Sequence, residues 1–322
     1  VSGISLLPES SPNLYDLIDF QNIGESIFCD IRDFKKLSDK FQAVDPEFIF
    51  HMAAQPLVRK SYAYPLETFS SNVMGTVNVL ECMRSLSNLK AAVMITTDKV
   101  YKEHGIQQAY GENDPLGGHD PYSSSKAASE IVIDSYQKSF FSEHHVPIAT
   151  GRAGNVIGGG DWSEDRLIPD AIRAWENQEI LRIRRPNSTR PWQHVLEPLS
   201  GYLLLAENLY KSPSEFSGGW NFGPHYDDVK PVDWILNYIT KLSPNNSWQL
   251  DGSNNPHEAN LLKLNISKAE SKLNWVPTWN LDTSLEKIVQ WQHAWNSGAD
   301  MHKVCLAEIK QFIKDSSKNG YN

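Results

Sequence analysis

Tyr122 and Lys126 stand four residues apart, and this pair is the first feature of the sequence that could do chemistry. Residues with this spacing project from one face of a helix, so the phenol and the ammonium group would lie side by side. A nearby ammonium charge favours tyrosinate and lowers the tyrosine pKa, which would make Tyr122 an acid/base group near neutral pH. Asp120-Pro121 is a typical helix start, whereas prolines flank the same spacing at Tyr226 and disfavour a helix there.

A second polar group, Thr97-Asp98-Lys99, directly follows an apolar, β-branched segment that we expect to be a buried strand. Ligands of open parallel sheets bind beyond the carboxyl ends of the strands, so these three side chains would face a site. Taken alone, the segment could equally be a solvated turn. The helix of Tyr122 begins roughly 25 residues later, a typical strand-to-helix distance in a parallel sheet, and this coupling favours the site.

Short β-branched or aromatic runs alternate with segments of helical period along the first half of the chain. This alternation is typical of an α/β fold, a Rossmann-like doubly wound parallel sheet with crossover helices. The segments predict strands over residues 1–6, 26–29, 48–52, 91–96 and 146–152, and helices over 34–44, 65–86 and 121–142.

The pattern changes after residue 160, because all ten tryptophans and many turn residues lie beyond it. We therefore expect a dinucleotide-binding domain over residues 1–160 and a smaller C-terminal α/β subdomain over 161–322, mostly substrate-binding, with some segments returning to the first domain. The chain begins in a strand-like segment and has no Gly-x-x-Gly-x-x-Gly loop for a cofactor pyrophosphate. We expect that the first βα unit of the fold is missing from it.

Composition limits the partners of this 322-residue chain, which has 30 Lys and Arg against 39 Asp and Glu, a net charge of −9. No basic cluster breaks that balance, which argues against nucleic acid. No apolar run approaches the roughly 20 residues that span a membrane. Cys29, Cys82 and Cys305 are far apart and lack metal-ligand spacing. We therefore expect a cytoplasmic, reducing environment and no metal.

Seven of the ten arginines lie between residues 152 and 190 of this acidic chain. Arginine suits bidentate recognition of phosphate, although surface ion pairs would explain most members of such a group. Arg166 precedes Leu167-Ile168-Pro169 and Arg190 precedes Pro191-Trp192-Gln193-His194, and these two are the best phosphate candidates.

Six stretches together resemble the extended short-chain dehydrogenase/reductase family, and within it the nucleotide-sugar 4,6-dehydratases. They are HMAAQPLVR at 51–59, NVMGT at 72–76, RAGNVIGGGDW at 152–162, DRLIPD at 165–170, RPWQHV at 190–195 and WNFGP at 220–224. The resemblance covers nearly the whole chain, and these stretches are far more specific than a Tyr-x-x-x-Lys spacing.

The resemblance implies catalytic roles for five residues. Tyr122 would take the proton of the sugar C4 hydroxyl, Lys126 would hold the nicotinamide ribose, and Thr97 would hydrogen-bond the C4 oxygen. Asp98 would be the general acid for the leaving C6 hydroxyl. Lys99 stands where other dehydratases carry the glutamate that is the presumed C5 base, which agrees with the branch that acts on CDP-glucose but leaves the identity of the base open.

The resemblance also implies an NAD cofactor, a nucleotide-sugar substrate, namely CDP-glucose, and a homo-oligomer formed through the helices after Pro65 and Pro121. With Tyr122 and Lys126, the implied cofactor contacts are Asp30 and Ile31 at adenine, Met52, Ala53, Ala54, Gln55 and Ser71 along the cofactor, and Asn155 near nicotinamide. Arg166, Arg190, Asn221 and His257 would contact the nucleotide diphosphate or nucleotide of the substrate.

Three other functions stay open from the sequence. A nucleotide-sugar 4-epimerase shares the Tyr/Lys pair but has no leaving group to protonate, so Asp98 and Lys99 beside Thr97 favour a dehydratase. Another nucleotide-sugar 4,6-dehydratase would use the same residues on a different base. A catalytically silent nucleotide-sugar-binding module is the non-enzymatic alternative, and the intact Thr97, Tyr122 and Lys126 argue against it.

Overall fold

The computed structural model describes residues 1–103, 108–141, 146–242, 247–251 and 262–319. Its central sheet contains four parallel strands in the order β10-β5-β4-β3. Their bounds are β3 Phe48–His51, β4 Ala91–Ile95, β5 Ile148–Ala153 and β10 Gly218–Phe222.

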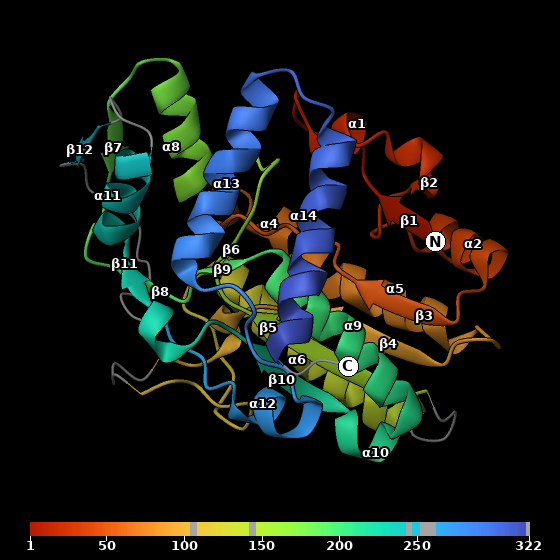
Figure 1. Ribbon diagram of the computed structural model, residues 1–322. Helices are drawn as coiled ribbons and strands as arrows, with labels where there is room; N and C mark the ends of the chain where they lie inside the picture. Colours follow the sequence, from red (N-terminus) through yellow and green to blue (C-terminus); the bar gives the residue numbers. More distant parts are fainter. Residues whose placement is uncertain (104–107, 142–145, 243–246, 252–261, 320–322) are drawn as a thin grey trace.

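Both faces of this sheet are covered by helices (Figure 1). In β4, Ala92 and Met94 pack toward the helices α2 (Phe34–Val44), α5 (Gly75–Arg84) and α6 (Pro121–Tyr136). Ala91 and Val93 pack toward α9 (Leu196–Lys211) and α12 (Ser267–Leu273) on the other face. Successive side chains of a strand point to opposite faces, so a strand buried on both faces must be apolar throughout, as β4 is. The α/β fold with a doubly wound parallel sheet that the sequence predicts is confirmed.

The helices on the first face follow the predicted segments closely. Residues 65–84 form one helical run that includes a π-helical turn, and Asp120 caps α6 by accepting from the Ser123 amide at 2.9 Å, with Pro121 in the first turn. The bounds are α2 Phe34–Val44, α3 Val58–Ala63, α4 Pro65–Phe69, η2 Ser70–Met74, α5 Gly75–Arg84, η3 Asp98–Val100, α6 Pro121–Tyr136 and η4 Gln137–Phe141.

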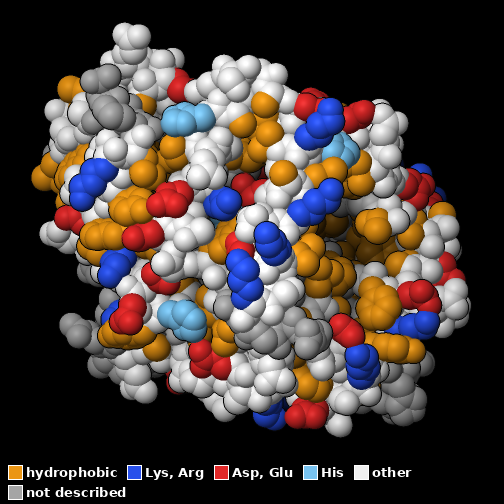
Figure 2. All heavy atoms as spheres, in the orientation of Figure 1, with side chains coloured by type: hydrophobic (Ala, Val, Ile, Leu, Met, Phe, Trp, Pro, Cys, Tyr) orange, Lys and Arg blue, Asp and Glu red, His pale blue; other side chains and the backbone are white. Residues whose placement is uncertain are grey.

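Two N-terminal strands form a separate parallel pair, with Ser2 opposite Glu25. They are β1 Ser2–Ser5 and β2 Glu25–Phe28, with α1 Leu14–Leu17 and η1 Phe20–Asn22 between them. The face seen in Figure 2 carries interspersed acidic and basic side chains rather than one basic patch. A hollow with hydrophobic walls lies beside α14 (Met301–Ser316) on this face.

Segments of the second half complete the central sheet, because β10 pairs with β5 and α9 covers the face formed by β4 and β5. The remainder packs around a separate apolar cluster that includes Trp192, Ile235 and Leu285. Figure 1 shows α13 and α14 lying side by side.

The bounds of the strands in this half are β6 Val156–Ile157, β7 Leu181–Ile183, β8 Thr189–Arg190, β9 Gln193–His194, β11 Lys230–Pro231 and β12 Trp248–Leu250. Those of the helices are α8 Leu167–Glu176, α9 Leu196–Lys211, α10 Pro213–Phe216, η5 Tyr226–Asp228, α11 Val232–Leu242, α12 Ser267–Leu273, α13 Leu281–Asn296, α14 Met301–Ser316 and η6 Ser317–Asn319.

Candidate active site

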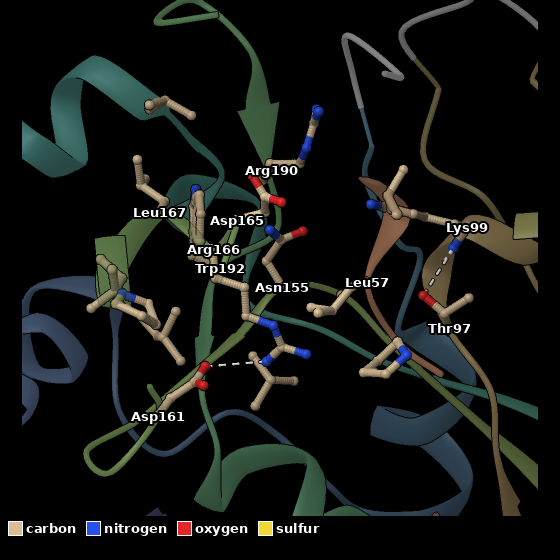
Figure 3. A pocket seen from close by; sticks show the side chains of 18 of the residues that line it. Leu57, Thr97, Lys99, Asn155, Asp161, Asp165, Arg166, Leu167, Arg190 and Trp192 are labelled. Carbon is tan, nitrogen blue, oxygen red and sulfur yellow. Dashed lines mark hydrogen bonds and ion pairs between the residues drawn. The ribbon is translucent and has the colours of Figure 1, made fainter. Parts of the chain in front are cut away.

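A cavity of about 400 Å³ lies beyond the carboxyl ends of β4 and β5. This is the place where ligands bind in open parallel sheets. The Thr97-Asp98-Lys99 segment and Tyr122 line it from the central sheet side, and Asn155, Arg166 and Arg190 line it from the second half. In Figure 3, Thr97 and Lys99 lie across the cavity from Asn155, Arg166 and Arg190. The structure therefore brings seven of the sequence-predicted site residues to one cavity.

The first turns of α6 carry Tyr122 and Lys126 into the buried part of the site, where they are 8% and 7% exposed. The Tyr122 amide donates to Ser61 Oγ of α3 at 3.1 Å, which fixes the start of the helix. Lys126 Nζ donates to the carbonyl oxygen of Ile95 at the end of β4, at 3.0 Å. The helix and the strand end are thus joined directly at the cavity.

Burial dominates the ionisation of this pair. It raises the pKa of Tyr122 to about 12, against the lowering effect of a hydrogen bond with Thr97. It lowers the pKa of Lys126 to about 8, although Glu130 opposes this shift. The expectation that Lys126 lowers the Tyr122 pKa is therefore wrong for the protein by itself, because loss of water disfavours the tyrosinate more than any neighbouring charge favours it.

The turn after β4 holds the other predicted catalytic groups. Thr97 Oγ1 donates to Asp98 Oδ1 at 3.0 Å and accepts from the Lys99 amide at 3.4 Å. Asp98 is 2% exposed, and burial raises its pKa despite the nearby Lys99 charge. Its second oxygen, Oδ2, has no hydrogen-bond partner within the described structure. A carboxyl with a raised pKa suits a proton donor.

Beneath this turn lies a buried ion pair that sequence reasoning missed. Glu130, one turn beyond Lys126, accepts from Arg152 Nε and NH2, each at 2.8 Å. It also accepts from the hydroxyls of Thr96 at 2.5 Å and Thr150 at 2.9 Å. The network ties α6 to the ends of β4 and β5, so it sets the position of Thr97 relative to Tyr122. Glu130 follows Lys126 by four residues, so the sequence already indicated that both side chains lie on the same face of α6.

Asn221 belongs to this buried network and is fully buried in β10. Its Oδ1 accepts from the Tyr101 hydroxyl at 2.6 Å, and its Nδ2 donates to backbone carbonyls of Tyr110 and Asn265. The residue does not line the cavity, and its expected contact with the nucleotide diphosphate stays a prediction. His257, the remaining substrate candidate, lies outside the described residues.

The residues expected along the cofactor follow β2 and β3. Asp30 accepts three side-chain and one backbone hydrogen bond from Arg32, and this holds the Asp30 pKa below its usual value. Met52 is 47% exposed, and Ala53 and Ala54 are partly exposed. Ile31 and Ser71 are likewise partly exposed. None of these residues lines the 400 Å³ cavity, and their contacts with the cofactor stay predictions.

Gln55 and Asn72 connect the segment after β3 to α6. Gln55 uses its side chain internally, since Nε2 donates to Thr68 and Oε1 accepts from the Leu57 amide. The Asn72 amide bridges the Gln55 backbone and Ser125 Oγ, at 2.7 to 3.0 Å. Asn72 is a further residue that sequence reasoning did not select.

Acidic side chains accompany the arginines of the far wall. Arg166 pairs with Asp161 at 3.2 Å, and Figure 3 shows this contact. Asp165 pairs with Arg59 of α3 at 2.7 Å and lies 3.9 Å from Arg184. Arg190 is 6% exposed. The cavity thus has a basic wall in which Asp161 holds Arg166 and Asp165 holds Arg59.

His51, at the end of β3, is a buried strand residue whose Nε2 lies 3.2 Å from Thr76 Oγ1. Burial, with a smaller effect of the Lys126 charge, lowers its pKa from the usual 6.5 to about 3. Between pH 6.5 and about 3, His51 therefore carries a proton in the unfolded chain but not in the folded protein. The free energy of unfolding falls as the pH decreases through this range.

We expect replacing His51 with Asn to flatten the acid side of the stability profile. Each pH unit below about 6.5 should cost the wild type up to roughly 1.4 kcal/mol more than the variant. Urea unfolding of both proteins at several pH values measures this difference, and parallel profiles would contradict the assignment.

Among the described residues, no group of three or more His, Cys, Asp or Glu side chains could hold a metal ion. No helix in the described part of the chain is long and apolar enough to cross a membrane.

The fold is that of known nucleotide-sugar enzymes. A solved UDP-glucuronic acid 4-epimerase from Bacillus cereus, in complex with UDP-glucuronic acid and NAD, is 24% identical, with a TM-score of 0.77 over 90% of each chain. The dTDP-glucose 4,6-dehydratase DesIV of Streptomyces venezuelae, a double mutant with NAD bound, is 20% identical, with a TM-score of 0.77 over 94% of this chain and 90% of that one.

Sequence comparison defines the family. The model of the GDP-mannose 4,6 dehydratase family matches residues 13–288. A CDP-glucose 4,6-dehydratase of Salmonella typhimurium is 48% identical over 99% of this chain and 90% of that protein. A probable dTDP-glucose 4,6-dehydratase of Sinorhizobium fredii is 26% identical over 82% of this chain and 77% of that protein. The chain belongs to the GDP-mannose 4,6 dehydratase family of nucleotide-sugar dehydratases, and the resemblance stated from the sequence is confirmed.

Proposed function

We propose that this chain is a CDP-glucose 4,6-dehydratase, a hydro-lyase that converts CDP-glucose to CDP-4-dehydro-6-deoxyglucose in deoxysugar biosynthesis. The observation that carries the proposal is the buried acid Asp98, which accepts a hydrogen bond from Thr97. Both residues line the same cavity as Tyr122, and arginines form the opposite wall of that cavity. The 48% identical relative is a CDP-glucose 4,6-dehydratase, and this supports cytidine as the base.

The cofactor of the proposed reaction is NAD, which when bound would supply a hydride acceptor for C4 of the sugar and a hydride donor for C6. The small residues Ala53 and Ala54 leave the end of β3 accessible to a flat ring, which fits a dinucleotide. Residues 1–160 would form the main cofactor-binding part, and 161–322 mostly the substrate-binding part. Asp30, Ile31, Met52, Ala53, Ala54, Gln55, Ser71 and Asn155 would line the cofactor, with Tyr122 and Lys126 at its reactive end.

Oxidation at C4 requires removal of the hydroxyl proton, and Tyr122 is the proposed base. Its pKa of about 12 must fall when substrate and cofactor bind. Lys126 would help if substrate and cofactor brought its charge beside the phenol, because a nearby positive charge favours the ionised form. Thr97, which already interacts with Tyr122, would hold the C4 oxygen while the proton moves.

Elimination follows from the 4-keto group, which acidifies the C5 proton. A base takes that proton, Asp98 gives its own proton to the C6 oxygen, the C6–O bond breaks and one water leaves. Lys99, whose Nζ lies 6.0 Å from the centre of the Tyr122 ring, would be the C5 base as the neutral amine, after its ammonium proton has been lost. The same C5 position regains a proton at the end, so the net change is loss of one water.

Substrate binding is assigned to the basic wall. Arg166 and Arg190 would meet the diphosphate, which carries the negative charge that guanidinium groups recognise in a bidentate manner. Arg59 and Arg184 also line the cavity, and their carboxylate partner Asp165 would compete with the diphosphate for them.

The test is incubation of the protein with NAD and CDP-glucose, beside GDP-mannose, dTDP-glucose and UDP-glucose in parallel reactions. Mass spectrometry of the nucleotide sugar should detect loss of one water from CDP-glucose. Dehydration of only another nucleotide sugar would mean that this sugar, and not CDP-glucose, is the substrate. A product of unchanged mass with inverted configuration at C4 would indicate an epimerase.

Replacement of Asp98 with Asn should separate oxidation from elimination. An amide cannot donate a proton to the leaving oxygen as an acid does, so dehydration should slow by roughly 10²- to 10³-fold. The C4 oxidation remains, and CDP-glucose should still reduce the bound cofactor, observed by nicotinamide absorbance. Equal loss of both steps would contradict the role of Asp98.

We also propose a homo-oligomer that forms through α4 and α6, which pack against each other. On these helices the side chains of Leu66, Phe69 and Ile131 are 87%, 39% and 61% exposed. Contact with a second subunit would remove these apolar side chains from water. Light scattering should detect a dimer or larger species, and Leu66→Glu should dissociate it. A monomeric wild type would contradict the proposal.

The proposed location is the cytoplasm, for which the three free thiols Cys29, Cys82 and Cys305 are the support.

A further inference from the structure

The elimination end of the site contains two polar groups that lack partners in the described part of the chain. Asp98 Oδ2 is buried with no hydrogen bond. Tyr202, on α9, is 4% exposed, and its hydroxyl makes no hydrogen bond to a described residue but stays accessible from the cavity. Both residues line the cavity beside Thr97 and Tyr122. A fully buried carboxyl oxygen is normally hydrogen-bonded, so Asp98 Oδ2 requires an explanation.

The ring of Tyr202 is fixed from two sides. A Cβ at Gly151 of β5 would lie 2.7 Å from Tyr202 Cε1 and 3.0 Å from Cδ1, so only glycine admits the ring there. Phe222 of β10 meets the ring edge-to-face, with centroids 5.4 Å apart. The phenol therefore reaches the cavity from the face of the sheet opposite α6, below the turn that carries Asp98.

The Tyr202 hydroxyl keeps its hydrogen under all ordinary conditions. Burial raises the pKa of Tyr202, and negative charge on Tyr122 or Asp98 raises it further. The interaction with Asp98 and Tyr122 means that both groups lie within electrostatic reach of the phenol. A neutral phenol can donate one hydrogen bond, and the acceptor without a partner in this wall is Asp98 Oδ2.

We propose that Tyr202 is a positioning residue of the elimination step, whose phenol donates a hydrogen bond to Asp98 Oδ2 once that carboxyl has given up its proton. The proposal rests on the proposed function, since it names the group that supports the acid of that reaction. When the Asp98 proton passes to the C6 oxygen and water leaves, a carboxylate remains in a buried place. Thr97 already donates to Oδ1, and Tyr202 would complete the pair at Oδ2.

A direct test measures the ionisation of Asp98 itself in wild-type and Tyr202→Phe protein, by ¹³C NMR of labelled aspartate with Asp98→Asn to assign the signal. Removing a donor to the charged form raises a carboxyl pKa, so we expect Asp98 in the variant to titrate about one pH unit higher. The other groups that act on Asp98 are Lys99, Arg190, Thr97 and Tyr122, and all are unchanged. An unchanged Asp98 titration would overturn the proposal, whether or not the protein dehydrates CDP-glucose.

Kinetics provide the second readout. In Tyr202→Phe, single-turnover loss of water should slow by roughly ten- to a hundredfold while reduction of the cofactor by CDP-glucose keeps its rate. The limb on which activity falls at high pH should move upward, because Asp98 must be protonated to act. Tyr210→Phe, on the same helix and 50% exposed, is the matched control and should change nothing.

These outcomes separate the two proposals. A wild type that removes no water from CDP-glucose contradicts the proposed function, while the Asp98 titration still decides the role of Tyr202. An equal slowing of oxidation and elimination in Tyr202→Phe, with an unmoved pH profile, would mean that the phenol only packs against Gly151 and Phe222.

Discussion

Tyr122→Phe is expected to lower kcat by roughly 10³- to 10⁴-fold, because the variant lacks the group that removes the C4 hydroxyl proton. The ring and its packing stay the same, so the fold and the affinity for the CDP moiety should be nearly unchanged. Steady-state assays of water loss measure the first quantity, and calorimetric titration with CDP measures the second.

The matched control is Tyr226→Phe, which removes a phenol from the other Tyr-x-x-x-Lys spacing in the sequence. Tyr226 is 65% exposed and outside the cavity, so its loss should leave kcat unchanged. A Tyr122→Phe enzyme with near wild-type turnover would remove Tyr122 from the mechanism.

Arg152→Met should destabilise the fold more than any surface change, by roughly 3 to 5 kcal/mol. The substitution leaves the Glu130 carboxylate, which is 4% exposed, without the guanidinium that donates two hydrogen bonds to it. Tyr101 also loses the guanidinium donor at its hydroxyl, 2.9 Å away. Urea unfolding gives the free energy of unfolding of each protein.

The double variant Glu130→Gln, Arg152→Met tests the cause of that loss. Glutamine removes the buried unpaired charge while it keeps a polar group near Thr96 and Thr150, so the double variant should recover part of the stability. A double variant no more stable than Arg152→Met would mean that packing, not charge, explains the effect.

Local patterns predicted the elements that position the site. The apolar strand before Thr97 and the Asp120-Pro121 helix start both depend on neighbouring residues alone, and both occur where predicted. Tyr122 reaches the cavity, and Lys126 contacts the end of β4, because strand ends and helix starts meet at one edge of a parallel sheet.

Features of the site that depend on long-range packing could not be predicted from the sequence. Burial, not the spacing to Lys126, controls the Tyr122 pKa, and burial depends on the whole fold. Asn221 is taken up by contacts with Tyr101, Tyr110 and Asn265, which lie 44 to 120 residues away in sequence. No local pattern reports such contacts.

The central claim is that one hydrogen moves from C4 to C6 of the same sugar while the C6 hydroxyl leaves as water. The most direct measurement is the reaction of CDP-glucose labelled with deuterium at C4, with the product analysed by NMR. The account predicts a 4-keto product whose deuterium lies in the C6 methyl group. Deuterium that stays at C4, in a sugar of inverted configuration and unchanged mass, would contradict it and indicate an epimerase.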